Sequence, residues 1–155
     1  MSNHPSKIMD TLKIKTSEIR LSVNGDAERV ISFNPADTLF AEKFYRLSAN
    51  VDAKLAEFTR KGKDLNADDE KNADGLPLNL QARIELQRDL CLYLRDEIDA
   101  LFGAGTSQNA FGDALEADAF PQFFEGITPY FHRARSEKVA QYTTDASAKR
   151  GRRKG

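Results

Sequence analysis

The segment that decides the fold is Leu101-Phe102-Gly103-Ala104-Gly105-Thr106-Ser107-Gln108-Asn109-Ala110-Phe111-Gly112, which ends the longest helical pattern in the chain. Gly103 directly follows the last periodic apolar residue, where helices commonly end in a left-handed glycine. Thr106 or Ser107 is suited to N-cap a short helical turn that follows, and Phe111 could then pack back beside Phe102. The segment therefore predicts a tight helical corner. Its structural residues are Phe102, Gly103, Gly105, Phe111 and Gly112.

The glycines of this corner do not form a nucleotide-binding motif. Gly103 and Gly105 have the spacing that begins a dinucleotide fingerprint, but Gln108 stands where the third glycine is due. The glycines also follow a helical pattern, whereas that fingerprint follows a strand. No Lys-Ser/Thr pair of a phosphate loop is present. We interpret the corner as structural, and we expect no bound cofactor.

Upstream of the corner, the sequence predicts a β-hairpin. Residues 19–23 alternate between apolar and polar side chains, Asn24-Gly25 is a strong hairpin turn, and residues 29–33 form the return strand. A two-residue loop would place Val30 opposite Ile19, whereas a three-residue loop would place Ile31 there. We favour the three-residue loop because it places Ile31 on the apolar face.

A long helix is predicted at residues 36–59. Asn34 can cap it, Pro35 fits the first helical position, and Asp37 meets the positive end of the helix dipole. Apolar residues then recur at spacings of three and four, which defines a single buried stripe. The stripe consists of Phe40, Phe44, Leu47, Val51, Leu55 and Phe58.

Residues 60–75 are almost entirely polar and predict a flexible connector or a frayed extension of the first helix. Asp64, Asn66 and Asp68 match the first three ligand positions of a calcium loop. However, Asp69 replaces the required glycine, and Gly75 stands where the closing carboxylate is due. We therefore expect no metal site.

The second long helix is expected to run from Leu76-Pro77 to about residue 102, with an apolar surface wide enough for contacts on two sides. Cys91 lies in its stripe as a small buried residue, and Asp99 is interpreted as a surface charge near its end.

A third helix is expected after a cap at Asp118. Its apolar stripe contains Phe120, Phe123, Phe124, Ile127 and Phe131 and can extend to Val139. Gly126 and Pro129 predict a bend or break near Thr128.

Composition sets limits on function. The chain has 155 residues, a net charge of −1, a single cysteine and two histidines, His4 and His132. No histidine, cysteine and carboxylate spacing matches a metal site or a catalytic triad. We therefore expect no catalytic residue, no metal and no enzymatic activity. No apolar run reaches the length of a membrane span.

The domain prediction has three parts: a flexible arm at residues 1–17, one domain at residues 18–142, and a disordered basic tail at residues 143–155. The fold class is mainly α, with a short hairpin followed by three or four helices packed as a small bundle. The tail carries a cluster of cations suited to weak polyanion contacts. These are Lys149, Arg150, Arg152, Arg153 and Lys154.

The width of the helical stripes has two interpretations. Tyr93, Phe102 and Phe111 either form part of a surface for another helical chain or belong entirely to the core. Our hypothesis is that the apolar stripes of the helices carry more apolar surface than the core of one small subunit can bury.

The order of these elements resembles a known family. An amino-terminal hairpin leads into Phe33-Asn34-Pro35-Ala36-Asp37, two long helices follow, and the second ends in the glycine corner at residues 101–112. This arrangement resembles the tail assembly chaperones of long-tailed, siphovirus-type bacteriophages of Gram-positive hosts. The resemblance covers residues 19–142.

The resemblance implies a non-enzymatic role in virion morphogenesis. Members bind the tape-measure protein, keep it soluble and help to recruit tail-tube subunits. It therefore implies tape-measure and tail-tube proteins as partners, location in the host cytoplasm and absence from the mature virion. Self-association is compatible with the wide stripes. The alternative is a small helical adaptor, or a nucleic-acid-associated protein that contacts polyanions through the basic tail.

Overall fold

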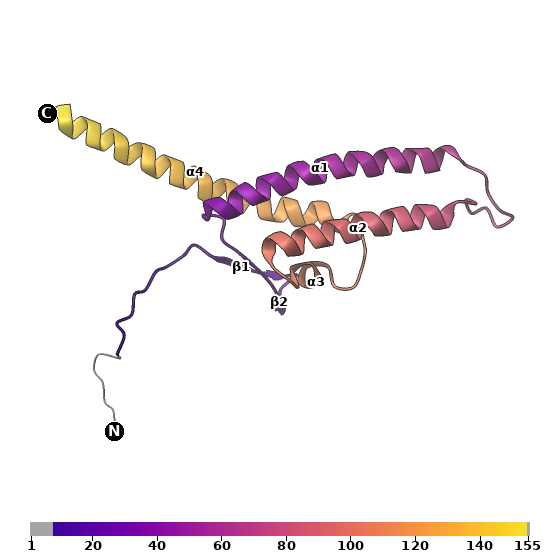
Figure 1. Ribbon diagram of the computed structural model, residues 1–155, viewed down its shortest axis with the longest axis horizontal. Coiled ribbons are helices and arrows are strands. Elements are labelled where there is room, and N and C mark those ends of the chain that lie inside the picture. The colour runs from indigo at the N-terminus through magenta and orange to yellow at the C-terminus, as the bar shows by residue number, and fades with distance from the viewer. Residues whose placement is uncertain (1–7, 155) are drawn as a thin grey trace, which may run out of the picture.

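The computed structural model describes the backbone of residues 8–154 and the side chains of residues 8–136. A two-stranded hairpin is followed by four helices, which confirms the predicted mainly helical class. Helices α1 (Thr38–Ala67) and α2 (Leu80–Phe102) run side by side in opposite directions, and the hairpin lies near one end of this pair (Figure 1). The start of α4 (Ala119–Lys154) lies near the middle of the α1–α2 pair.

Strands β1 (Ile19–Val23) and β2 (Asp26–Phe33) form the hairpin. Asn24 and Gly25 connect them with positive φ angles of 53° and 76°, as a two-residue primed turn requires. The predicted register was wrong, because Ile19 lies opposite Phe33. The pairing shifts between Ser22 and Val23, so β2 contains unmatched residues that the count from the turn did not include. The predicted apolar face is nevertheless correct, since Ile31 and Phe33 are buried.

Helix α1 begins two residues later and ends eight residues later than predicted. Asp37 is its N-cap and accepts hydrogen bonds from the backbone N–H groups of Leu39 and Phe40, at 3.0 and 3.4 Å. Asn34 instead accepts from the N–H of Ala36 at 3.0 Å, in the turn before the helix. Residues 60–67 are helical because lysine, alanine and leucine favour helix and Leu65 continues the apolar stripe. Asp64 and Asn66 therefore lie on a helix rather than in a loop.

The connector between α1 and α2 spans residues 68–79, and α2 begins after it at Leu80. The expected start at Leu76-Pro77 was too early, because Leu78 donates its backbone N–H to Glu70 O at 2.9 Å within the connector. The side-chain amide of Asn79 donates to Leu65 O at 2.8 Å, and Arg83 donates to Leu65 O at 3.2 Å. These two side chains join the start of α2 to the end of α1.

Helix α4 continues through Pro129, so of the predicted bend or break near Thr128 the break does not occur. Proline leaves one backbone carbonyl of the preceding turn without its helical donor. That carbonyl belongs to Glu125, and the Thr128 hydroxyl donates to the neighbouring carbonyl of Phe124 at 2.7 Å. The buried residues Ile127 and Phe131 hold the helix on both sides of the proline. The backbone is helical to Lys154, which differs from the disordered tail expected from residue 143; alanine, lysine and arginine in that segment favour helix.

The core is rich in phenylalanine, as the composition predicts. Phe44 of α1 stacks on Phe131 of α4 with ring centroids 4.3 Å apart, and Phe33 of β2 stacks on Phe131 at 5.6 Å. Phe102 meets Phe33, Phe40 and Phe123 edge to face at 5.2–5.8 Å. One aromatic cluster therefore joins the hairpin, α1, α2 and α4.

Replacing Phe131 with alanine tests this cluster. Phe131 is 2% exposed, and its truncation leaves a cavity between α1, α4 and the hairpin. We expect the free energy of unfolding to fall by about 3–5 kcal/mol in urea denaturation. Leu78→Ala is the control, because Leu78 is 61% exposed and should change stability by less than about 0.5 kcal/mol. Equal effects of the two substitutions would contradict the described packing.

Candidate interaction surface

The glycine corner forms as predicted, with a different assignment of roles. Gly103 ends α2 with a φ of 115° and a ψ of 152°, which is a positive φ outside the left-handed helical region. Gly105, with a φ of 88° and a ψ of −8°, is the left-handed residue and occupies the N-cap position of α3 (Thr106–Phe111). Thr106 and Ser107 are buried residues of the first turn of α3, so neither is its N-cap.

Asp99 caps α3 from the neighbouring helix. Its carboxylate accepts from the backbone N–H of Ser107 at 2.7 Å and from the Ser107 hydroxyl at 2.8 Å. A carboxylate at this position satisfies helical N–H groups and meets the positive end of the α3 dipole. Interpreting Asp99 as a surface charge was therefore wrong. The sequence signal was present, because a polar residue one turn before a glycine corner can reach across it.

The aromatic arrangement at the corner also differs from the prediction. Phe111 packs on Phe120 and Phe123, at 4.6 and 5.7 Å, and not directly on Phe102. Phe123 contacts both rings and thus lies between them. The α3 helix turns Phe111 toward the start of α4, a direction that spacing alone did not reveal.

The predicted partner residues are half-buried and pack against the core. Phe102 packs against four aromatic rings, those of Phe33, Phe40, Phe44 and Phe123, so most of its contacts are within the core. Tyr93 lies beneath the Lys54 ammonium, whose nitrogen is 5.4 Å from the ring centroid. Burial, and then the charge of Glu97, raises the pKa of the Tyr93 hydroxyl. The structure does not bring Tyr93 together with Phe111 in one exposed patch.

An apolar groove lies between α1 and α2, and we call it the α1–α2 groove. Its first part, about 360 Å³, includes Phe44, Val51, Leu55, Leu90 and Phe124. Its second part, about 440 Å³, includes Leu55, Phe58, Leu65, Ile84 and Leu90. Leu55 and Leu90 line both parts, so the two parts adjoin.

The α1–α2 groove extends along most of α1. Its α1 wall runs from Phe44 to Leu65, which corresponds to about 30 Å of helix. Phe120, Pro121 and Phe124 of α4 border the first part, but no α4 residue lines the second. The outer half of the pair therefore lacks a third helix, and Leu55 and Ile84 are 37% and 55% exposed.

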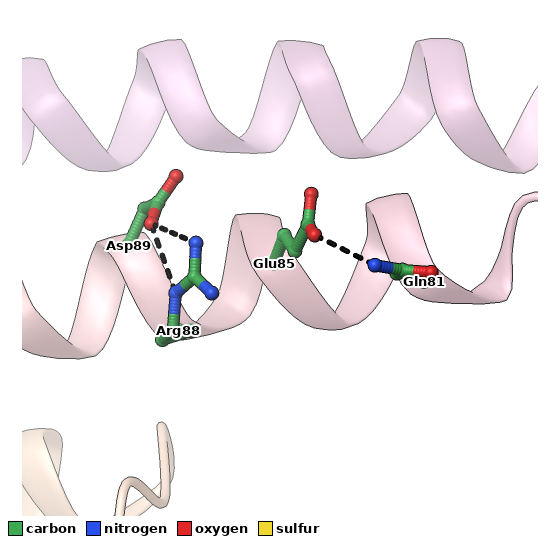
Figure 2. A network of polar contacts seen from close by, with 4 residues as sticks. All are labelled: Gln81, Glu85, Arg88 and Asp89. Carbon is green, nitrogen blue, oxygen red and sulfur yellow. Dashed lines mark hydrogen bonds and ion pairs between the residues drawn. The ribbon is translucent and has the colours of Figure 1, made fainter.

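Polar side chains surround the apolar surface. Figure 2 shows exposed contacts on α2, where Gln81 donates to Glu85 at 3.1 Å and Arg88 pairs with Asp89 at 3.2 Å. On α1, Glu57 pairs with Lys61 at 3.0 Å and with Lys54 at 3.5 Å. The hydrogen bond from Lys61, and then the charge of Lys54, lowers the pKa of Glu57. These exposed pairs contribute little stability, but they keep both helices hydrated outside the groove.

The described residues offer little for chemistry. No group of three or more His, Cys, Asp or Glu side chains among them could hold a metal ion. Cys91 is fully buried, and its burial raises the thiol pKa. The side chains of Lys149, Arg150, Arg152, Arg153 and Lys154, the predicted polyanion contacts, lie outside the described residues. No helix in the described part of the chain is both long enough and apolar enough to cross a membrane.

Comparison of the chain with protein-family models, curated proteins and solved structures found no match.

Replacing Asp99 with alanine tests the capping of α3. Two hydrogen bonds to Ser107 would be lost, so we expect the free energy of unfolding to fall by about 1–2 kcal/mol. Asp96→Ala is the matched control, since Asp96 is exposed on the same helix and removes the same charge. Urea denaturation measures both variants. A loss of equal size in both would assign the effect to net charge rather than to the cap.

Proposed function

We propose that this chain is a phage tail assembly chaperone that binds the tape-measure protein, keeps it soluble and helps to recruit tail-tube subunits. Its role is non-enzymatic and is carried out in the cytoplasm of the bacterial host. The partner is inferred from the resemblance to the tail assembly chaperones. That resemblance rests on the hairpin, the Phe33–Asp37 helix start and the glycine corner. The observation that carries the proposal is the α1–α2 groove, which is apolar, long and only partly covered.

The groove fits a helical client, meaning the helical chain that the chaperone would bind. Two antiparallel helices bury their apolar stripes fully only when a third element covers the furrow between them. The first turns of α4 cover one end, and an amphipathic client helix would take the corresponding place along the outer half. Binding would remove Leu55 and Ile84 from water together with the apolar face of the client.

This arrangement also accounts for the polar surroundings. A long client with repeated apolar faces aggregates when those faces meet one another. A bound chaperone replaces such contacts with its own groove and presents charged residues such as Glu57, Lys61 and Arg88 to water. The solubility of the complex then follows from the chaperone surface.

Co-expression with a tape-measure protein encoded near this chain tests the proposal. We expect the wild-type chain to increase the soluble fraction of the tape-measure protein severalfold. Leu55→Asp combined with Ile84→Asp should abolish most of this gain, because two carboxylates would be desolvated by a bound apolar helix. Both positions are partly exposed, so the variant should still fold.

Leu39→Asp is the matched control, because Leu39 is an exposed apolar residue of α1 outside the groove. It should retain the wild-type effect on client solubility. Circular dichroism and urea denaturation establish that all variants are folded. If the wild-type chain leaves the tape-measure protein as insoluble as before, the chaperone proposal fails; if the groove variant works as well as wild type, the client binds elsewhere.

A further inference from the structure

Residues 8–17, which we call the arm, carry the most exposed apolar side chains described in the protein. Ile8, Met9, Leu12 and Ile14 are 77–88% exposed, whereas no other large apolar side chain among residues 8–136 exceeds 61%. The arm forms neither helix nor strand and runs away from the rest of the structure (Figure 1). Such concentrated exposure indicates a segment that is covered by something other than its own subunit.

The sequence of the arm fits an added β-strand. Leu12 and Ile14 alternate with Lys13 and Lys15, so an extended backbone would place two apolar side chains on one face and two cations on the other. Thr11, Ile14 and Thr16 are β-branched residues that favour strands. The arm is therefore suited to pair with an open sheet edge.

The hairpin has one covered edge and one open edge. At β2, the Asn109 amide donates to Val30 O at 3.0 Å, and Arg29 donates to the carbonyls of Asn109 and Ala110 at 2.8 and 3.0 Å, so α3 covers that side. Among the described residues, the backbone of β1 makes no hydrogen bond to any element other than β2. The outer edge of β1 is therefore available for a third strand.

A groove of about 540 Å³ lies beside β1, and we call it the β1 groove. Residues 21–23 of β1 and Asn24 of the turn line it, together with Arg29 and Ile31 of β2 and Ala110 and Phe111 of α3, so the groove lies against the hairpin and reaches along β1. Phe123, Gly126 and Ile127 line it from α4. A Cβ atom built on Gly126 would meet nothing within 4 Å, so there is room for a side chain entering from an added strand.

The arm of the same chain is poorly placed to fill this groove. It leads directly into β1, and only Thr16, Ser17 and Glu18 separate Lys15 from Ile19. These residues lack the glycine or asparagine of a tight reversal, and the structure carries the arm away from the edge. A second copy of the chain has no such restriction.

Charge complementarity favours the second copy. The arm contains two lysines and one aspartate, whereas residues 18–142 contain seven more acidic than basic residues. Glu116 and Arg29 are the charged residues that line the β1 groove; Arg29 is bound to the carbonyls of α3, and Asp113 and Asp118 flank Glu116 in sequence. A cationic arm therefore approaches an acidic body, which favours association of unlike segments of two identical chains.

We propose that the arm of one copy adds as a third strand to β1 of another copy, with Leu12 and Ile14 in the β1 groove. Reciprocal exchange closes a dimer, and onward exchange extends a chain of subunits. This association does not depend on the α1–α2 groove.

Light scattering of the full-length chain over a range of concentrations tests the proposal. We expect concentration-dependent association, and Leu12→Asp combined with Ile14→Asp should weaken it at least about tenfold by placing two carboxylates in an apolar groove. Thr11→Asp combined with Ser17→Asp adds the same charge on the opposite face and should retain association. All four positions are exposed, so folding is not at risk.

The groove side has its own test. Gly126→Leu should fill the β1 groove and weaken association, whereas Glu125→Leu, on the exposed neighbouring residue, should not. A chain with Ile14→Cys mixed with a chain carrying Gln122→Cys should form a disulfide between the two chains under copper-phenanthroline oxidation. Cys91 is buried and should not form a disulfide under these conditions.

Three results would overturn the proposal. The first is a wild-type chain that stays monomeric at the highest accessible concentration. The second is association that the Leu12→Asp and Ile14→Asp pair leaves unchanged. The third is a disulfide that forms only within a single chain when both cysteines are placed in it. None of these results bears on the solubility of a co-expressed client, so this proposal and the proposed function fail separately.

Discussion

The coverage of the α1–α2 pair by α4 is the constraint on which the rest of the structure depends. Phe44, Phe102 and Phe131 meet where α4 crosses the pair, and there the core is closed. Beyond Leu55 the two helices continue without a third layer. Because the apolar stripes of both helices extend past α4, the same interaction that stabilises the fold also leaves an apolar furrow open at one end.

Much of this architecture was predictable because it follows from local periodicity. The hairpin turn at Asn24-Gly25, the stripe of α1 and the burial of Cys91 each follow from residues close together in the chain, and the structure confirms them. The candidate groove was only half predictable. Leu55 was assigned to the apolar stripe of the first helix, but its exposure and that of Ile84 depend on where the contact with α4 ends, which no local pattern encodes.

The errors share a physical cause. The role of Asp99, the direction of Phe111 and the pairing of Ile19 with Phe33 each depend on contacts between elements or on residues left unmatched in a strand. A spacing argument treats each element as isolated, so it assigned Asp99 to the solvent and Phe111 to the nearest earlier ring. Pro129 is a similar case, since its local tendency to break a helix is outweighed by the burial of Ile127 and Phe131.

The glycine corner connects these observations to association. Asp99 fixes α3 against the end of α2, and α3 in turn places Asn109 and the carbonyls bound by Arg29 along β2. One edge of the hairpin is thereby covered, and the other remains open beside Gly126. An unpaired edge in a two-stranded sheet normally invites uncontrolled pairing. Among the described residues, only the arm has the alternation and exposure to match the open edge of β1, and it directly precedes that strand. The sequence therefore supplies both the open edge and its occupant. The β1 groove is also separate from the α1–α2 groove that is available to a helical client.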